Sequence, residues 1–585
     1  MYNFINVKLF KEYWGIILVV ALSVVPLVAL AKAGLPVTHD GQDHVARIAN
    51  FYQNLSEGNM VPRWAGNLNW GYGHPILMFL YPLPSYIASL FHFLGFSLVD
   101  SVKLVFAAAF IASGITMYLW LREFLGEYSA IAGAILYNFA PYRFVDLYVR
   151  GAIGEHVAFV FPPLICYFLL KISNSPPPRS ERTHLGGVIA NRFYFAGACF
   201  SLAGLILSHN ALLLMFLPFI AFYAIYLIYN SKNRKLFGPK AHQPLAETIQ
   251  HSRLAITYIL IGILGFGLSF FFLYPAFAEG KYTLRDIVAS TEYFSRFVRL
   301  DQLFYGPWTY GISGQFTVQV GIMQWILVLG SLFTVHSLFR KNRKMLTLYS
   351  IVLIVFIASL FLMLVESDFI WRSLTTLQKF QFPWRFLSVS VFASATLGAI
   401  LLYSIKNENF QKLALAMVLI AAFVLTNDYW KAKDYLVKPE LFYTGIYDST
   451  TDTGESSPVW SVRFMEKRPA ARAEVIAGEA KIDETLRTST HHKYQIGASE
   501  KSRIRENTLY FPGWRVYIDG KRYDQVQFQD PEHRGLITYY VPQGMHIVDV
   551  EFRETRTRTV ANYISLASLL LIVGIFFRTY ILPKR

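Results

Sequence analysis

Potentially reactive side chains are concentrated in one short stretch near the start of the chain, residues 39–47, which reads His-Asp-Gly-Gln-Asp-His-Val-Ala-Arg. If this stretch is helical, Asp40, His44 and Arg47 share one face, because residues four and seven apart fall on the same side of a helix. Asp43 then neighbours Arg47 on that face. Carboxylates beside imidazoles and a guanidinium are groups that can serve as a general base, a metal site or a phosphate clamp.

The helix itself is predicted from the apolar residues of the same region, which recur at helical spacing and favour an amphipathic helix lying on a membrane. These residues are Val45, Ile48, Ala49, Tyr52 and Leu55. A simpler interpretation also stays open, in which Asp40 only caps the helix, Asp43 stabilises its positive end and His44 faces water. The two interpretations do not exclude each other.

A second polar group, Arg150 with Glu155 and His156, stands where an apolar segment begins. Ionisable residues near membrane depth are functional candidates by default. The alternative is that Glu155 merely occupies the first turn of the next helix, where the helix dipole stabilises a carboxylate. A third group, Ser208-His209-Asn210, separates two apolar stretches and either closes a tight turn or joins the same site.

The fourth group is Gln381-Phe382-Pro383-Trp384-Arg385, in which Pro383 can start a helix and Arg385 enters the membrane edge. Arginine binds phosphate in a fixed fork, so Arg385 is a candidate ligand for a lipid phosphate. The alternative is that its side chain snorkels to ordinary headgroups. The nucleotide-binding glycine motifs and the His-Glu-x-x-His motif are absent, which argues against ATP-driven transport by this chain alone.

The composition places these groups in a membrane protein. Of 585 residues, 54% are hydrophobic and 16% are charged, whereas soluble proteins average about 25% charged residues. The net charge of +16 comes from basic clusters between apolar runs, as at residues 340–344. This is the pattern of cytoplasmic loops, so the charge does not indicate a nucleic-acid partner.

Thirteen segments are candidate membrane crossings, since a spanning helix needs about 20 mostly apolar residues. They are 13–31, 76–95, 101–121, 128–141, 156–172, 191–207, 210–230, 254–275, 318–338, 346–365, 386–405, 411–426 and 559–577.

The basic residues favour twelve crossings. Lys8 and Lys11 indicate a cytoplasmic N-terminus, and the tail from Arg578 indicates a cytoplasmic C-terminus. Two cytoplasmic ends require an even number, so one candidate does not cross. We expect this to be 76–95, which prolines interrupt, with the short segment 128–141 as the alternative. The inner segments then hold 18 Lys and Arg.

The segment 427–558 is polar and contains short runs of alternating apolar and polar residues. The alternating run Trp514–Ile518 is followed by Asp519-Gly520, a strong signal for a two-residue hairpin turn. More alternating residues follow between Tyr539 and Val550. Repeated short strands with turn signals predict a small β-sandwich, and the charge pattern places it on the non-cytoplasmic side.

At these motifs the chain resembles two groups of prokaryotic membrane proteins. The N-terminal part is similar to the family labelled "6-pyruvoyl-tetrahydropterin synthase-related", through 39–44, Arg150-Gly151 with Glu155, 208–210 and 381–385. The C-terminal part is similar to YfhO-type proteins, through Phe511-Pro512-Gly513-Trp514, Asp519-Gly520-Lys521 and 541–546. Both groups are similar to GT-C glycosyltransferases, which take sugars from polyprenyl-phosphate donors.

The resemblance implies roles for particular residues. Asp40 would be the catalytic base, Asp43 its neighbour, Glu155 the second acidic position and Arg385 a donor-phosphate ligand. The other candidates for substrate or donor binding are His44, Arg47, Arg150, His209 and Asn210. A divalent metal, Mg or Mn, held by Asp40, Asp43 and Glu155 is an alternative to Arg385 or Arg150 for offsetting the phosphate charge.

The resulting prediction is a GT-C-like polytopic α-helical protein of a prokaryotic inner membrane. Its parts are a membrane domain, 1–426, with a first outer loop, 32–100; an extracytoplasmic β-rich domain, 427–558; and a final helix with a cytoplasmic tail, 559–585. It would move a sugar from a polyprenyl-phosphate donor to an outer glycan, lipid or protein acceptor, with inversion. Two alternatives stay open: a lipid or polysaccharide transporter without covalent chemistry, and a non-catalytic envelope assembly factor.

Overall fold

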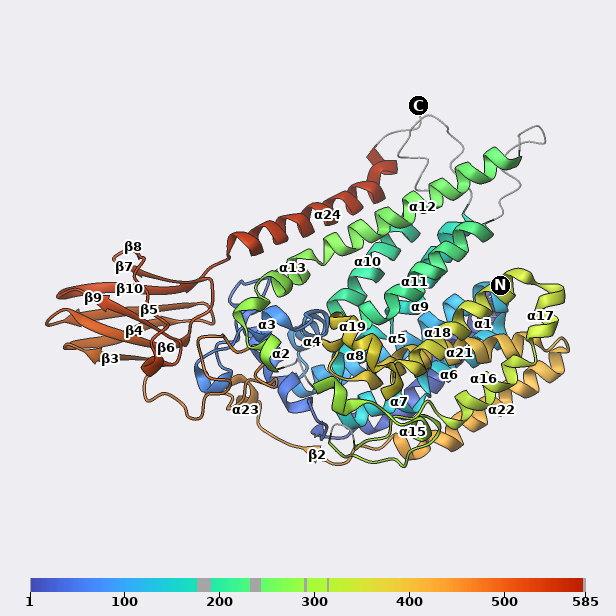
Figure 1. Cartoon of the computed structure of the whole chain (residues 1–585), viewed down its shortest axis with the longest axis horizontal. Coiled ribbons are helices and arrows are strands. Elements are labelled where there is room, and N and C mark those ends of the chain that lie inside the picture. Colours follow the sequence, from blue (N-terminus) through green and yellow to red (C-terminus); the bar gives the residue numbers. More distant parts are fainter. Residues whose placement is uncertain (1, 176–190, 232–242, 289–291, 313–314, 582–585) are drawn as a thin grey trace.

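The computed structural model describes residues 2–175, 191–231, 243–288, 292–312 and 315–581. Figure 1 shows a body of helices with a β-sandwich at one end, and the last helix, α24 (Arg556–Ile581), returning from the sandwich to the helical body. The inner segments expected between the candidate crossings 156–172 and 191–207, and between 210–230 and 254–275, lie partly outside the described residues.

Within the described ranges, nine helices are long and apolar enough to cross a membrane, or ten if one bent pair counts as a single crossing. The chain is therefore a multi-pass membrane protein. The nine are Tyr13–Ala31, Leu98–Leu125, Ile153–Asn174, Asn210–Asn230, Thr248–Leu268, Arg343–Phe361, Pro383–Ser404, Glu408–Tyr429 and Arg556–Phe577. The bent pair is α16 (Ile322–Leu332) with α17 (Val335–Lys341), at 46°.

Two further candidates form helices that are short for a crossing: α6 (Glu127–Asn138) and α10 (Arg192–Ser208). The segment expected not to cross, 76–95, is broken into α3 (Ile76–Phe79) and α4 (Leu83–Phe93). Pro82 and Pro84 flank the start of α4, and proline cannot supply the hydrogen bonds that a continuous helix needs. The total of twelve crossings and their direction remain predictions.

The first outer helix differs from its prediction. It is α2 (Gly41–Ser56), and its apolar side packs against protein rather than lying on a membrane: Val45 and Ile48 are buried, and α2 contacts α4, α5 (Leu98–Leu125) and α23 (Leu441–Thr444). The expectation that His44 faces water is also wrong, since the side chain is 3% exposed.

The chain after α6 is helical and buried, whereas the gap between the candidate crossings 128–141 and 156–172 predicted a loop. It forms α7 (Pro141–Phe144), a π-helical turn at Val145–Arg150, α8 (Ile153–Ala158) and α9 (Phe161–Asn174). All residues from Pro141 to Phe159 are buried. π-Turns inside helices are frequent at functional sites. This one carries Asp146 and Arg150 into the protein interior.

The β-sandwich has two antiparallel sheets, with strand orders β4-β5-β10-β7-β8 and β3-β6-β9. The strands are β3 (Ala473–Ala477), β4 (Ala480–Arg487), β5 (His491–Ala498), β6 (Ser502–Leu509), β7 (Trp514–Ile518), β8 (Lys521–Tyr523), β9 (Leu536–Val541) and β10 (Gly544–Phe552). The predicted hairpin is confirmed: Asp519 and Gly520 connect β7 and β8 with φ values of 50° and 76°. Two positive φ values in a two-residue turn match the right-handed twist of the strands.

The first outer loop is built into the sandwich. Trp64 and Met78 from that loop are fully buried in the hydrophobic core that the two sheets share. The Trp64 ring meets Trp514 edge-on, with centroids 5.4 Å apart. A two-stranded sheet, β1 (Leu35–Pro36) with β2 (Tyr435–Leu436), makes a second connection between the loop and the segment before the sandwich.

We expect Trp64→Ala to detach the first outer loop from the sandwich. Removing a fully buried tryptophan costs about 3–5 kcal/mol through lost burial and the cavity that remains. Limited proteolysis should then cut between residues 57 and 75 at a protease dose that leaves the wild type intact. Trp70→Ala, which removes a half-buried tryptophan of the same loop, is the control. Equal protection of the two variants would contradict this packing.

Candidate active site

Glu155, in the first turn of α8, is the centre of a buried polar cluster. Its side chain is 1% exposed. Oε1 accepts hydrogen bonds from Arg150 at 2.7 Å and from Arg385 at 2.9 Å, and Oε2 accepts one from the Tyr142 hydroxyl at 2.7 Å. His209 Nε2 lies 3.8 Å from Oε1. Three groups singled out in the sequence, at 150–155, 209 and 385, therefore meet at one carboxylate.

The two arginines are held differently. Arg150 also donates to Asp146 at 2.5 Å and stacks over the Trp384 ring at 4.5 Å. Arg385 donates to the carbonyl of Phe380 at 2.8 Å and lies over the Phe382 ring. Its side chain is 16% exposed against 7% for Arg150. Arg385 is thus the guanidinium of this cluster that is more open to a ligand.

Asp40 lies next to this cluster through its backbone. Its N–H donates to the carbonyl of Arg150 at 3.0 Å, and the N–H of His39 donates to Val149 at 3.0 Å. Gly151 makes the approach possible: its φ is +68°, and a Cβ there would lie 2.3 Å from the Thr38 hydroxyl. Only glycine combines this conformation with this close contact.

The Asp40 carboxylate is half-buried and takes part in no hydrogen bond or ion pair with the residues that the structure describes. Asp40 does occupy the N-cap position of α2, but its side chain does not cap the helix. The capping interpretation therefore leaves this carboxylate unexplained. A carboxylate with unused lone pairs can accept a proton.

The other charged residues of α2 contact a later segment, around Tyr447 and Thr451. The Tyr447 hydroxyl donates to Asp43 at 3.0 Å, and Arg47 Nε donates to Thr451 Oγ1 at 2.8 Å. His44 Nδ1 is 3.2 Å from Arg47 Nη1. Burial raises the pKa of Asp43 and, together with the nearby charge of Arg47, lowers that of His44 well below its usual value. His44 is therefore a neutral partner of Arg47.

Tyr81 belongs to this site, although the sequence did not single it out. It lies between α3 and α4, and its ring is 5.1 Å from that of His209. Burial raises the pKa of its hydroxyl to about 12, and the charges that act on it next are those of Arg47, Asp40, Arg385 and Glu155. The hydroxyl forms no hydrogen bond within the described part of the chain. The only sequence signal for Tyr81 was its position within the proline-interrupted segment 76–95.

His209 and Asn210 form the start of α11 (Asn210–Asn230). His209 Nδ1 accepts from the N–H of Leu212 at 3.3 Å, so the predicted tight turn at 208–209 is also a helix cap. Its other nitrogen faces Glu155. Asn210 Oδ1 is buried without a partner among the described residues.

The structure does not bring Asp40, Asp43 and Glu155 together as metal ligands. Among described residues, only two groups of three place their ligand atoms within 4.8 Å of one another: His491, Asp549 and Glu551, and Asp530, Glu532 and His533. Both are in the sandwich. Glu155 already accepts from two arginines and a tyrosine. The carboxylates predicted to hold Mg or Mn therefore do not fit that role as a set.

Comparisons with known proteins give partial similarities. No family model matches the chain. An uncharacterized protein of Lactococcus lactis subsp. cremoris (strain MG1363) is 24% identical over 280 residues, which are 46% of this chain and 41% of that protein. This chain thus matches less than half the length of that relative.

Solved structures to which the chain is similar include glycosyltransferases and an oligosaccharyltransferase. Arabinofuranosyltransferase AftD from Mycobacteria aligns with 74% of this chain and 28% of its own, at 12% identity and a TM-score of 0.46. ArnT from Cupriavidus metallidurans, bound to undecaprenyl phosphate, aligns with 74% and 68%, at 14% identity and 0.36. The Archaeoglobus fulgidus oligosaccharyltransferase aligns with 71% and 52%, at 13% and 0.36.

The residues themselves define the chemistry available here. The Asp40 carboxylate, which has no partner among the described residues, lies beside a buried Arg150–Glu155–Arg385 cluster at the ends of two apolar helices. Such a site can accept a proton at one point and hold negative charge at another.

Proposed function

We propose that the chain is a membrane glycosyltransferase that moves a sugar from a polyprenyl-phosphate donor to a hydroxyl of an acceptor on the outer face of a prokaryotic inner membrane. Both termini would be cytoplasmic. The observation that carries the proposal is the unbonded Asp40 carboxylate, fixed by its backbone to Arg150 of the Glu155 cluster. The motif resemblance supplies the donor class.

In the proposed reaction the acceptor hydroxyl attacks the anomeric carbon of the donor sugar. The new carbon–oxygen bond forms as the bond to the phosphate oxygen breaks, and the bonding electrons leave with polyprenyl phosphate. Asp40 accepts the hydroxyl proton, as a general base does. One displacement of this kind inverts the anomeric centre.

Arg385 is the proposed ligand of the donor phosphate, because it is the more exposed guanidinium of the cluster and a planar fork suits phosphate oxygens. Glu155 is then a positioning residue. One of its carboxylate oxygens accepts hydrogen bonds from both arginines and the other accepts one from Tyr142, so neither is placed to accept a proton from the substrate. No step of this reaction is assigned to a metal.

The proposal is tested by reconstituting the full chain in liposomes with a panel of polyprenyl-phosphate sugars and the native acceptor fraction. Transfer should release free polyprenyl phosphate in proportion to sugar incorporated, which a transporter without covalent chemistry does not do. The enzyme interpretation would be wrong if, for every sugar tested, the donor crosses the bilayer and no polyprenyl phosphate is released.

We expect Tyr81→Phe to lower the transfer rate by about fivefold, the value of one neutral hydrogen bond of roughly 1 kcal/mol. The variant keeps the ring that contacts His209 and removes only the unpartnered hydroxyl. Steady-state transfer is measured beside Tyr86→Phe, whose hydroxyl bonds to the carbonyl of Met60 elsewhere in the loop. A Tyr81→Phe rate equal to the wild type would exclude a substrate contact by this hydroxyl.

A further inference from the structure

The first outer loop and the β-sandwich enclose a polar cavity that the proposed reaction does not use. Its volume is about 30 Å³, room for one small group. Both partners contribute to its lining, which includes Gln53 and Asn67 from the loop side and Arg472, Arg487, Ser489 and Thr508 from the sandwich. The cavity therefore exists only because the two parts are packed together.

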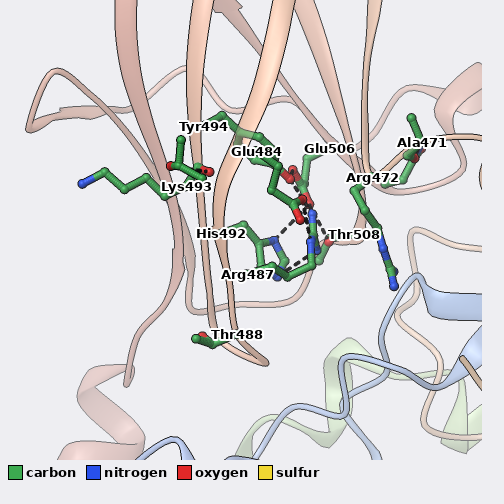
Figure 2. Close-up of polar contacts among 12 residues, drawn as sticks. Ala471, Arg472, Glu484, Arg487, Thr488, His492, Lys493, Tyr494, Glu506 and Thr508 are labelled. Atoms are coloured by element: carbon green, nitrogen blue, oxygen red, sulfur yellow. Dashed lines mark hydrogen bonds and ion pairs between the residues drawn. The ribbon is translucent and has the colours of Figure 1, made fainter. Parts of the chain in front are cut away.

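One of its two guanidinium groups is neutralised. Arg487 donates to Glu484 at 2.8 Å and to Glu506 at 3.1 Å, and its Nη1 is 3.1 Å from His492 Nε2. Figure 2 shows this group converging on the buried Glu506, which also accepts from Thr508 at 3.0 Å. The carboxylates of Glu484 and Glu506 therefore compensate the positive charge of Arg487.

The second guanidinium is not neutralised. Arg472 Nη1 donates to the carbonyl of Gly71 at 2.8 Å, and the side chain forms no ion pair with a carboxylate in the described ranges. Figure 2 shows it extending from the sandwich toward the first outer loop, apart from the group around Arg487. Burial, and then the charge of Arg487, lower the pKa of Arg472. A half-buried positive charge thus faces the cavity with only a neutral partner.

An unpartnered hydroxyl lines the same cavity. Ser489 is 3% exposed, and its Oγ has no hydrogen-bond partner among the described residues. Its backbone N–H is fixed by Glu57 at 2.9 Å. Buried polar atoms in folded proteins are nearly always satisfied, so a free hydroxyl in a cavity indicates water or a ligand. Arg472 forms no direct ion pair in the described ranges, although the charges of Glu484 and Glu506 act on it, so a ligand beside it is expected to be an anion.

We propose that this cavity binds the anionic group, a carboxylate or a phosphate, of an acidic glycan, with Arg472 and Ser489 as its ligands. The remainder of the glycan lies outside the cavity. Along α2, the distance from the N-cap residue Asp40 to Gln53, which lines the cavity, is about 20 Å at 1.5 Å per residue. A glycan anchored here would extend along α2 toward Asp40. Its identity as the acceptor rests on the proposed function, whereas the anion site does not.

The test uses the full chain in nanodiscs of zwitterionic lipid and isothermal titration with glucuronate, inorganic phosphate and glucose. We expect an anion to bind and glucose not to bind. Arg472→Gln should weaken anion binding by at least about tenfold, the effect of losing a charge-assisted hydrogen bond. Arg472→Lys should retain part of it. Arg522→Gln, at an exposed arginine paired with Asp524, is the matched control.

Binding of glucuronate alone would identify a sugar carboxylate, and binding of phosphate alone a phosphate substituent. The proposal is overturned if neither anion binds, if glucose binds as tightly, or if Arg472→Gln binds like the wild type. If Arg472→Gln fails to fold, Arg472→Lys and Ser489→Ala decide. Asp40→Asn should bind the anion normally, so failure of the glycosyltransferase proposal leaves this result readable.

Discussion

Asp40→Asn should reduce sugar transfer by about 100- to 10,000-fold, the usual contribution of a general base. The asparagine keeps the size of the side chain and removes its ability to accept a proton. Folding should not suffer, because the Asp40 carboxylate makes no hydrogen bond within the described ranges, and its backbone N–H, which holds it to Arg150, is unchanged. The measurement is the transfer rate in liposomes together with the thermal unfolding midpoint of the same preparation.

The matched control is Asp100→Asn, which changes an aspartate in the first turn of another helix, α5, where the carboxylate accepts from Ser97 and pairs with Lys103. That variant should keep full activity. A rate for Asp40→Asn above about a tenth of the wild type would remove Asp40 as the base. In cells, the same two variants are compared by their surface glycan profiles. The product glycan should be lost in Asp40→Asn and retained in Asp100→Asn.

Glu155→Gln should instead destabilise the protein, by about 3–5 kcal/mol. Breaking a buried ion pair by removing one partner has this effect, because the remaining charge stays buried without compensation. Here two arginines lose their shared carboxylate, and Arg385 has no other carboxylate within the described contacts. The unfolding midpoint in detergent should fall, and transfer should fall with it because Arg385 is no longer held.

A double-mutant cycle separates the two causes. The double variant Glu155→Gln/Arg385→Gln removes both charges of this ion pair. Its stability should therefore be partly restored relative to Glu155→Gln, which reports a coupling between the two sites. Activity should not recover, because Arg385 is the proposed phosphate ligand. Additive losses of stability would show that the 2.9 Å contact between these side chains carries no coupling.

Several features could be predicted from the sequence because local patterns specify them. Apolar stretches near 20 residues identify membrane helices whatever their neighbours, and each of the nine long helices in the described ranges overlaps with a predicted segment. The Asp519-Gly520 turn is equally local, since it depends on a few adjacent residues. The resemblance of short motifs also directed attention to Glu155 and Arg385.

Local patterns misplaced two segments because the same pattern fits two environments. An amphipathic helix buries its apolar face equally well on a membrane or on other helices, and α2 packs on helices. A polar segment between apolar runs reads as an outer loop, yet residues 141–159 are buried because Arg150, Asp146 and Glu155 pair with one another. Charges at such depth are tolerated when they are paired.

The sequence by itself determined that this is a multi-pass membrane protein with a β-rich part, and which short stretches carry reactive groups. The tertiary structure alone decided that Glu155 and Arg385, 230 positions apart, form one cluster, that Tyr81 joins it, and that the Asp40 side chain has no partner among the described residues. It also decided that Arg472 faces a cavity against the first outer loop. The physical reason is that burial and charge pairing depend on segments far apart in the chain, which periodicity and spacing do not encode.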